Sequence, residues 1–150
     1  GGHKNEDGTV TGWRQLASLA DALKNNYFAL KQDTEILGEH VIRLTVTEGL
    51  GRAVARRGIS ASEIDWYLPH YSSELFRDRV YDAMVGIGFD IPYEKWFTNL
   101  AYKGNTGSAS IYVMLEELFH SGRLQPGEKI LCYIPESGRF SVAYMLLTVV

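Results

Sequence analysis

Two polar side chains follow apolar segments at positions where they could act on a substrate. His70 comes directly after the apolar run 64–68 and Pro69, so its imidazole would leave a buried strand in a defined direction. Asn105 stands in a Gly-rich loop whose tight turns let a helix begin close to it. An imidazole and a carboxamide can each donate an N–H to an oxygen that gains negative charge during a reaction. In open α/β sheets, ligands usually bind at the loops that follow strands.

A third segment, Ser137-Gly138-Arg139, is predicted to be the turn of a hairpin. Taken one at a time, the three segments have simpler explanations. His70 alone reads as a structural loop histidine, the Asn105 segment as a helix cap, and the Gly138 segment as a tight turn. The Asn105 loop is not a phosphate-binding P-loop, because the Gly-Lys-Ser/Thr ending is absent.

The single cysteine, Cys132, does not have the setting of a nucleophile. It lies between Leu131 and Tyr133 in an apolar run that predicts a central strand. A catalytic thiolate is favoured at a helix N-terminus or beside a cation, so we expect Cys132 to be buried and unreactive. A lone cysteine also excludes an internal disulfide framework and is typical of a reducing compartment, by default the cytoplasm.

The elements that would position these residues alternate along the chain. Apolar spacing predicts helices over 13–30, 34–57, about 72–87 and 108–121, and strands over 64–68, 95–98, 129–134 and 140–149. This order predicts an α/β fold: a mostly parallel sheet packed with helices and ending in an antiparallel strand pair.

Two of the predicted helices carry further signals. The helix over 34–57 contains Gly38, Gly49 and Gly51, which weaken it and suggest close packing against something else. The helix from Ser108 is apolar along one side, and we expect that side to contribute to an exposed face where another part of the protein docks. Its apolar residues are Ile111, Met114, Leu115, Leu118 and Phe119.

The composition excludes several classes of function. The 150 residues are 45% hydrophobic and 22% charged, with a formal net charge of −3, which is ordinary for a soluble globular protein. The sequence has no stripe of Lys and Arg that would indicate nucleic-acid binding. It also has no apolar run that approaches the roughly 20 residues of a membrane span. We expect a single domain over 1–150, with 1–36 as a helical lead-in, and no metal site.

Taken together, the motifs resemble a known family. Residues 65–70 read Asp-Trp-Tyr-Leu-Pro-His, 104–110 read Gly-Asn-Thr-Gly-Ser-Ala-Ser, and 121–128 read Ser-Gly-Arg-Leu-Gln-Pro-Gly-Glu. From about Leu37 to Val150 the chain resembles the C-terminal half of β-ketoacyl-acyl-carrier-protein synthase III enzymes, which have the thiolase fold. The resemblance implies that the N-terminal half of the enzyme is missing from this chain.

The resemblance also implies a reaction. In this family a cysteine accepts an acyl group from acyl-CoA or acyl carrier protein, and the enolate of malonyl-acyl-carrier-protein then attacks the acyl-cysteine. By motif match, His70 and Asn105 are the catalytic His and Asn, and the N–H of Gly138 is the oxyanion-hole donor. The nucleophilic cysteine would lie in the missing half, so this chain alone would be inactive. The intact enzyme would be a homodimer without any cofactor.

The sequence departs from the family pattern in two places. Tyr71, Ser72 and Ser73 replace a Gln-Ala-Asn that helps to hold the pantetheine arm, so Ser72 and Ser73 are candidate substrate-binding residues. Glu136 and Arg139 bring charge to a turn that is rich in glycine in the family. These charges argue against a plain fatty-acid starter enzyme, and the His-Tyr-Ser-Ser string resembles condensing enzymes for aryl-polyene or dialkylresorcinol pigments.

Arg77 and Arg79 are candidate contacts for an acidic carrier protein, with solvated helix charges as the simpler explanation.

Two other functions stay open. One is a type III polyketide synthase or another thiolase-fold acyltransferase, which would share His70 and Asn105. The other is a non-catalytic partner subunit that keeps the thiolase fold.

Overall fold

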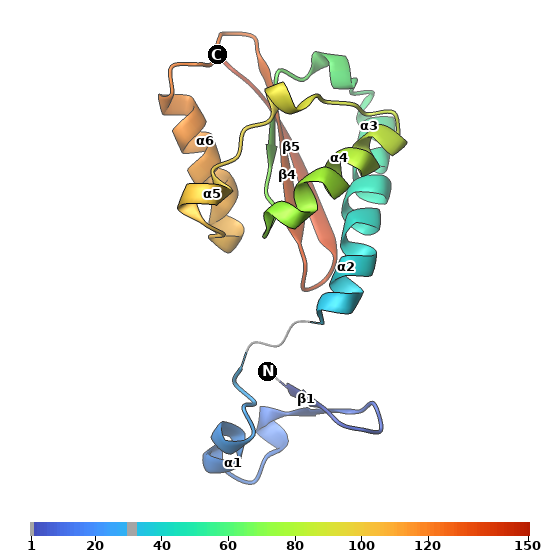
Figure 1. The fold of residues 1–150 in the computed structure, drawn as a ribbon, viewed down its shortest axis with the longest axis vertical. Helices are drawn as coiled ribbons and strands as arrows, with labels where there is room; N and C mark the ends of the chain where they lie inside the picture. Colours follow the sequence, from blue (N-terminus) through green and yellow to red (C-terminus); the bar gives the residue numbers. More distant parts are fainter. Residues whose placement is uncertain (1, 30–32) are drawn as a thin grey trace. The chain divides into compact units, whose positions relative to one another are not determined.

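The computed structural model describes residues 2–29 and 33–150, in two units, Gly1–Glu35 and Ile36–Val150 (Figure 1). In the smaller unit, β1 (Gly2–Lys4) pairs antiparallel with β2 (Val10–Gly12). The 3₁₀ helix η1 (Trp13–Gln15) and the helix α1 (Leu19–Lys24) follow.

The helix expected over 13–30 is wrong in its length. The Ser18 side chain accepts the backbone N–H of Asp21, so α1 begins only after Ser18. Asn26 has a positive φ of 54°, which leaves the right-handed helical path. Leu30, the last residue of the expected apolar stripe, lies outside the described residues.

The larger unit is built on a sheet with the strand order β3-β4-β5. Its strands are β3 (Trp66–Pro69), β4 (Lys129–Glu136) and β5 (Ser141–Thr148). β3 pairs parallel with β4, with Leu68 opposite Cys132, and β4 pairs antiparallel with β5, with Cys132 opposite Met145. The α/β class and the closing antiparallel pair are therefore confirmed.

The strand expected over 95–98 is reduced to one parallel bridge between Trp96 and Tyr67. The 3₁₀ helix η5 (Tyr93–Lys95) occupies the residues before Trp96. After Phe97, whose N–H donates to the Tyr67 carbonyl at 2.9 Å, the chain turns toward α5 (Leu100–Lys103). The segment is therefore extended only long enough to form one bridge with β3.

One face of the sheet is covered by the helical segment over 34–57 and by α4 (Figure 1). The first segment runs without a break through α2 (Thr34–Ile42), the π-helix η2 (Arg43–Leu50) and α3 (Gly51–Arg57). It ends at Gly58, whose φ of 66° forms a left-handed cap. The 3₁₀ turn η4 (Glu74–Phe76) leads into α4 (Arg77–Gly86).

The other face is covered by α6 (Ser110–His120), which follows η6 (Gly107–Ala109) and lies beside α5 (Figure 1). Ile111, Met114 and Leu118 are buried against Leu68 and Cys132. The expectation that these three residues form an exposed docking face is therefore wrong, because their side of α6 covers the chain's own sheet. Phe119, one position further around the helix, is 69% exposed.

The close packing expected at the helical glycines is found at one of them. A Cβ on Gly49 would lie 2.7 Å from Cγ1 of Val142 on β5. Gly38 and Gly51 have nothing within 4 Å of such a Cβ, so the expectation is wrong for these two.

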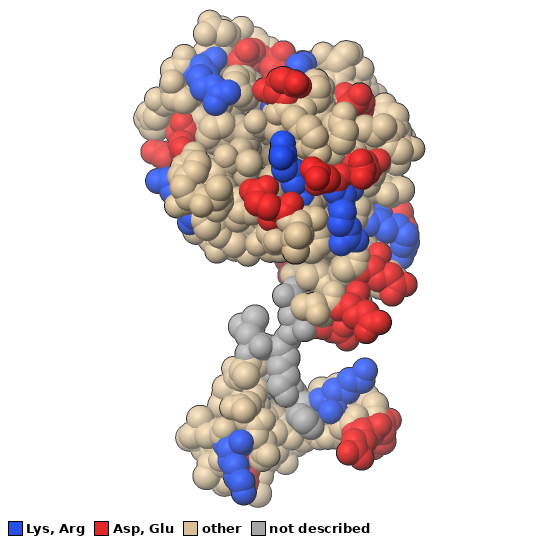
Figure 2. Space-filling view, in the orientation of Figure 1, with Lys and Arg blue, Asp and Glu red and all other residues tan. Residues whose placement is uncertain are grey.

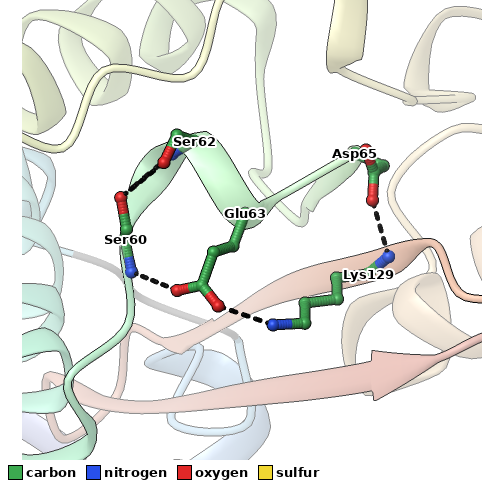
Figure 3. Close-up of polar contacts among 5 residues, drawn as sticks. All are labelled: Ser60, Ser62, Glu63, Asp65 and Lys129. Carbon is green, nitrogen blue, oxygen red and sulfur yellow. Dashed lines mark hydrogen bonds and ion pairs between the residues drawn. The ribbon is translucent and has the colours of Figure 1, made fainter.

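A polar cluster holds the starts of β3 and β4 together (Figure 3). Glu63 accepts the Ser60 N–H in a capping box at η3 (Ala61–Glu63) and also accepts Lys129 Nζ at 2.6 Å. Asp65 accepts the N–H of Lys129 at 2.9 Å. These contacts align the two strands where they begin, so that both run toward the same end of the sheet.

Acidic and basic side chains are interspersed over the larger unit on the face shown in Figure 2. Among residues 2–29 and 33–150, no helix has both the length and the apolar character needed to cross a membrane. The same residues form no group of three or more His, Cys, Asp or Glu side chains that could hold a metal ion.

Candidate active site

A cavity of about 280 Å³ opens at the end of the sheet where β3 and β4 finish. Its apolar wall comes from the helices on one face of the sheet: Leu37, Val41, Ile42, Phe76 and Val80. Its polar border comes from His70 and Ser72 after β3, from Asn105 in the loop between α5 and η6, and from Glu136 and Ser137 at the end of β4. An apolar cavity with a few polar groups at one side is the usual form of a site for a small ligand.

His70 is held at the cavity by the sheet itself. Its main-chain N–H donates to the carbonyl oxygen of Tyr133 at 2.9 Å, which continues the β3–β4 pairing past Pro69. The side chain is partly buried, and this desolvation lowers the pKa of His70 below its ordinary value of 6.5. The imidazole is therefore neutral at pH 7 and keeps one N–H to donate.

Asn105 reaches the same cavity from the loop between α5 and η6. Its Oδ1 accepts the N–H of Gly107 at 2.9 Å, so the amide nitrogen is the end of the side chain that can donate to a ligand. Gly104 and Gly107 both have positive φ angles, 74° and 61°, which explains the glycines on each side of Asn105. The structure thus brings His70 and Asn105 to one cavity from separate loops.

The other predicted binding residues divide into two groups. Ser72 borders the cavity. Ser73 is instead the N-cap of η4, where its hydroxyl accepts the N–H of Leu75. Arg77 lies over the Tyr93 ring, with Cζ 4.2 Å from the ring centroid, and Arg79 donates to the carbonyl oxygen of Gly38. Neither arginine borders the cavity, and a carrier-protein contact stays a prediction for both.

Gly138 lies in the β4–β5 turn beside the cavity, but its neighbours Glu136 and Ser137 form the border. The N–H of Gly138 donates to Glu136 Oε1 at 2.7 Å. In this structure the predicted oxyanion-hole donor is therefore bonded to a carboxylate of its own chain.

Cys132 is fully buried in the core between the sheet and α6, as expected. Burial raises the pKa of its thiol to about 12. It is not among the residues that border the cavity. A thiol in this environment is a packing group, which agrees with the sequence interpretation.

Sequence reasoning missed the residues that build the apolar wall and brace it. Thr45 and Tyr133 form a buried hydroxyl pair with 2.6 Å between their oxygens, and Tyr144 donates to the Thr45 carbonyl at 2.8 Å. Burial raises the pKa of Tyr133 to about 12. Leu37 and Val41 are spaced as one side of a helix, so the sequence could have shown that this side of the helix over 34–57 faces inward. The spacing could not have identified a cavity.

Residues 54–139 match the family described as 3-oxoacyl-[acyl-carrier-protein (ACP)] synthase III C terminal. This chain belongs to the 3-oxoacyl-[acyl-carrier-protein] synthase III family. The range matched to the synthase III family includes His70, Asn105 and Gly138.

Curated relatives agree with this assignment. The chain is 34% identical over 120 residues to a β-ketoacyl-[acyl-carrier-protein] synthase III of Prochlorococcus marinus, covering 78% of this chain and 33% of the relative. It is 31% identical over 137 residues to that of Synechococcus elongatus, covering 83% and 38%. The chain thus spans only about a third of the length of these synthase III relatives.

Solved structures show the same thiolase-like fold. OleA from Xanthomonas campestris matches with a TM-score of 0.68 and 25% identity, covering 78% of this chain and 32% of OleA. Synthase III from Thermus thermophilus matches with a TM-score of 0.63 and 25% identity, covering 97% and 38%. The chain therefore has the fold of part of a larger condensing enzyme of the synthase III type.

Proposed function

We propose that this chain is the C-terminal catalytic part of a synthase III-like acyltransferase. The enzyme would condense an acyl thioester with malonyl-acyl-carrier-protein in the biosynthesis of fatty acids or of related lipids and polyketides. The nucleophilic cysteine would come from a part of the enzyme outside these 150 residues, because Cys132 is buried away from the cavity. This chain alone would then be inactive.

The first half-reaction is acylation of that cysteine. Its thiolate attacks the carbonyl carbon of acyl-CoA or acyl carrier protein, and the π electrons of the C=O bond move to the oxygen. The N–H of Gly138 would donate to this oxyanion. As the intermediate collapses, the C–S bond to the carrier breaks and the leaving thiolate takes a proton from solvent.

His70 and Asn105 would serve the second half-reaction. When the malonyl C–C bond breaks and CO₂ leaves, the electron pair passes to the thioester oxygen of the enolate. Two neutral N–H donors at that oxygen stabilise the developing charge without binding the substrate carboxylate too strongly. The enolate carbon then attacks the acyl-cysteine to form the β-ketoacyl product and free the thiolate.

The observation that carries this proposal is that His70 and Asn105, from separate loops, border one cavity with an apolar wall. The lowered pKa of His70 supports it, since the neutral imidazole is the form the reaction needs. Carrier-protein and acyl-CoA binding, and a homodimer in the intact enzyme, belong to the same proposal.

Separate assays of the two half-reactions in the complete enzyme test the proposal. We expect His70→Ala and Asn105→Ala each to slow CO₂ release from malonyl-acyl-carrier-protein by about 10²–10³, because each removes one preorganised donor. Acyl-enzyme formation, measured by mass spectrometry, should largely survive. His120→Ala, on the exposed end of α6, is the matched control. Unchanged decarboxylation in both variants would refute the assignment.

The likeness to OleA favours a second candidate, a thiolase-fold acyltransferase other than a synthase III. That enzyme would share His70 and Asn105 and would differ from a synthase III in the thioesters that it condenses. Incubating the complete enzyme with acyl-CoA alone, and looking for a condensed product, separates the two candidates.

A further inference from the structure

Glu136, the last residue of β4, turns its carboxylate back onto the hairpin turn beside the cavity. Oε1 accepts the N–H of Gly138 at 2.7 Å, and Oε2 accepts the N–H of Arg139 at 3.0 Å. Each carboxylate oxygen is therefore bonded to a main-chain donor of the same turn. Hydrogen bonds to an ionised acceptor are shorter and roughly twice as strong as those between neutral groups.

The carboxylate lies directly against Gly138. A Cβ built on this glycine would be 2.8 Å from Glu136 Oε1, a distance that real Cβ atoms essentially never show. Two successive main-chain N–H groups that point to one anion form the kind of donor pair that binds oxyanions in other proteins. Here the chain's own carboxylate occupies that pair.

We propose that Glu136 competes with the acyl-thioester oxygen for the N–H of Gly138, and that its displacement limits the rate of acylation. This inference rests on the proposed role of Gly138 in the acylation half-reaction. The Glu136 carboxylate leaves the donor when the substrate oxygen arrives and returns when the acyl group has been transferred.

Glu136 is bonded to Gly138, so its effect on the reaction should differ from that of His70 and Asn105. Those two residues would act on the malonyl thioester, whereas Gly138 would act on the acyl thioester. Removal of the Glu136 carboxylate should therefore change acylation and leave decarboxylation nearly unchanged.

Single-turnover acylation of the complete enzyme by octanoyl-CoA tests the inference. We expect Glu136→Ala to raise the acylation rate constant about tenfold, because it removes a charge-assisted acceptor from the donor. Glu136→Gln should give a smaller increase, since a neutral amide oxygen can still accept. Glu94→Gln removes the same charge from an exposed position outside the cavity and should stay within twofold of the unaltered enzyme.

A rate for Glu136→Ala that is unchanged or lower overturns the inference, because the carboxylate would then only shape the turn that presents Gly138. The dispersion of the other amide resonances in a ¹H–¹⁵N spectrum confirms that each variant is folded, and in Glu136→Ala the Gly138 amide should lose the downfield shift of a proton bonded to a carboxylate. If neither the unaltered enzyme nor any variant is acylated, the proposed function fails and the inference fails with it. If acylation occurs but Glu136→Ala does not accelerate it, the inference alone fails.

Discussion

The main-chain N–H of His70 donates to the carbonyl oxygen of Tyr133 at 2.9 Å. Pro69 has no N–H and cannot donate to β4, so the N–H of His70 is the next one that can pair with that strand. It fixes the backbone of His70 to β4, and Tyr133 itself also borders the cavity. The candidate catalytic histidine is thus positioned by the sheet.

His70 should make the stability of the folded chain depend on pH. Its pKa in the folded chain is lower than in the unfolded chain, where it is about 6.5. The unfolded state therefore binds the proton more tightly, and stability falls as the pH drops from about 6.5 through the lowered folded value. Urea unfolding between pH 7.5 and pH 5 should show this loss, and His70→Gln should reduce it. An equal loss in the variant would contradict the assignment to His70.

Cys132 should react slowly with thiol reagents while the chain is folded. With a thiol pKa of about 12, only about one molecule in ten thousand carries the thiolate at pH 8, and the sulfur is fully buried. After unfolding in urea, labelling should become rapid and reach one equivalent. Stoichiometric labelling under native conditions at the same rate would show that the thiol is accessible and would reopen its role.

Gly49 and Gly51 should respond in opposite ways to alanine. The Cβ of Gly49→Ala would lie 2.7 Å from the branched Val142 side chain, and such overpacking costs about 1–3 kcal/mol of stability. Gly51→Ala meets nothing within 4 Å in a helical backbone and should add about 0.5–1 kcal/mol. Urea unfolding of both variants provides the comparison, with Gly51→Ala as the matched control. Equal effects of the same sign would show that η2 is not packed closely on β5.

The hydroxyls of Thr45 and Tyr133 should be coupled in stability. Thr45 Oγ1 donates to the Val41 carbonyl at 2.6 Å, so its single proton is used and Tyr133 is the donor within the pair. Thr45→Val leaves the buried Tyr133 hydroxyl without a partner, which costs about 1–3 kcal/mol.

The double variant Thr45→Val with Tyr133→Phe removes both partners, so it should cost less than the sum of the two single variants, by at least about 0.5 kcal/mol. Unfolding free energies of the four proteins complete the cycle. Strict additivity would mean that the two hydroxyls do not depend on each other.

The parts of the fold that the sequence predicted well are those determined by nearby residues. The helix over 34–57 depends on apolar spacing and on Gly58 as a left-handed cap, and both act within a few residues. The capping box of Ser60 and Glu63 is equally local. The helix over 13–30 was predicted too long because the apolar stripe outweighed Ser18, whose capping of α1 is also a local signal.

The errors elsewhere concern partners that are distant in the sequence. The spacing of Ile111, Met114 and Leu118 shows that one side of α6 must be covered, but not that β3 and β4 cover it. The segment over 95–98 has strand composition, yet a strand needs a neighbour and room to pair, and η5 leaves room for one bridge to Tyr67.

The sequence by itself determined which residues could do chemistry here: His70 after a strand that Pro69 completes, Asn105 between two glycines, and a cysteine set in an apolar run. Only the tertiary structure decided that His70 and Asn105 border one cavity and that Glu136 occupies the N–H of Gly138. The physical reason is one of range. Turn chemistry and apolar period are fixed within a few residues, whereas a shared cavity depends on the register and packing of elements that meet only when the chain is folded.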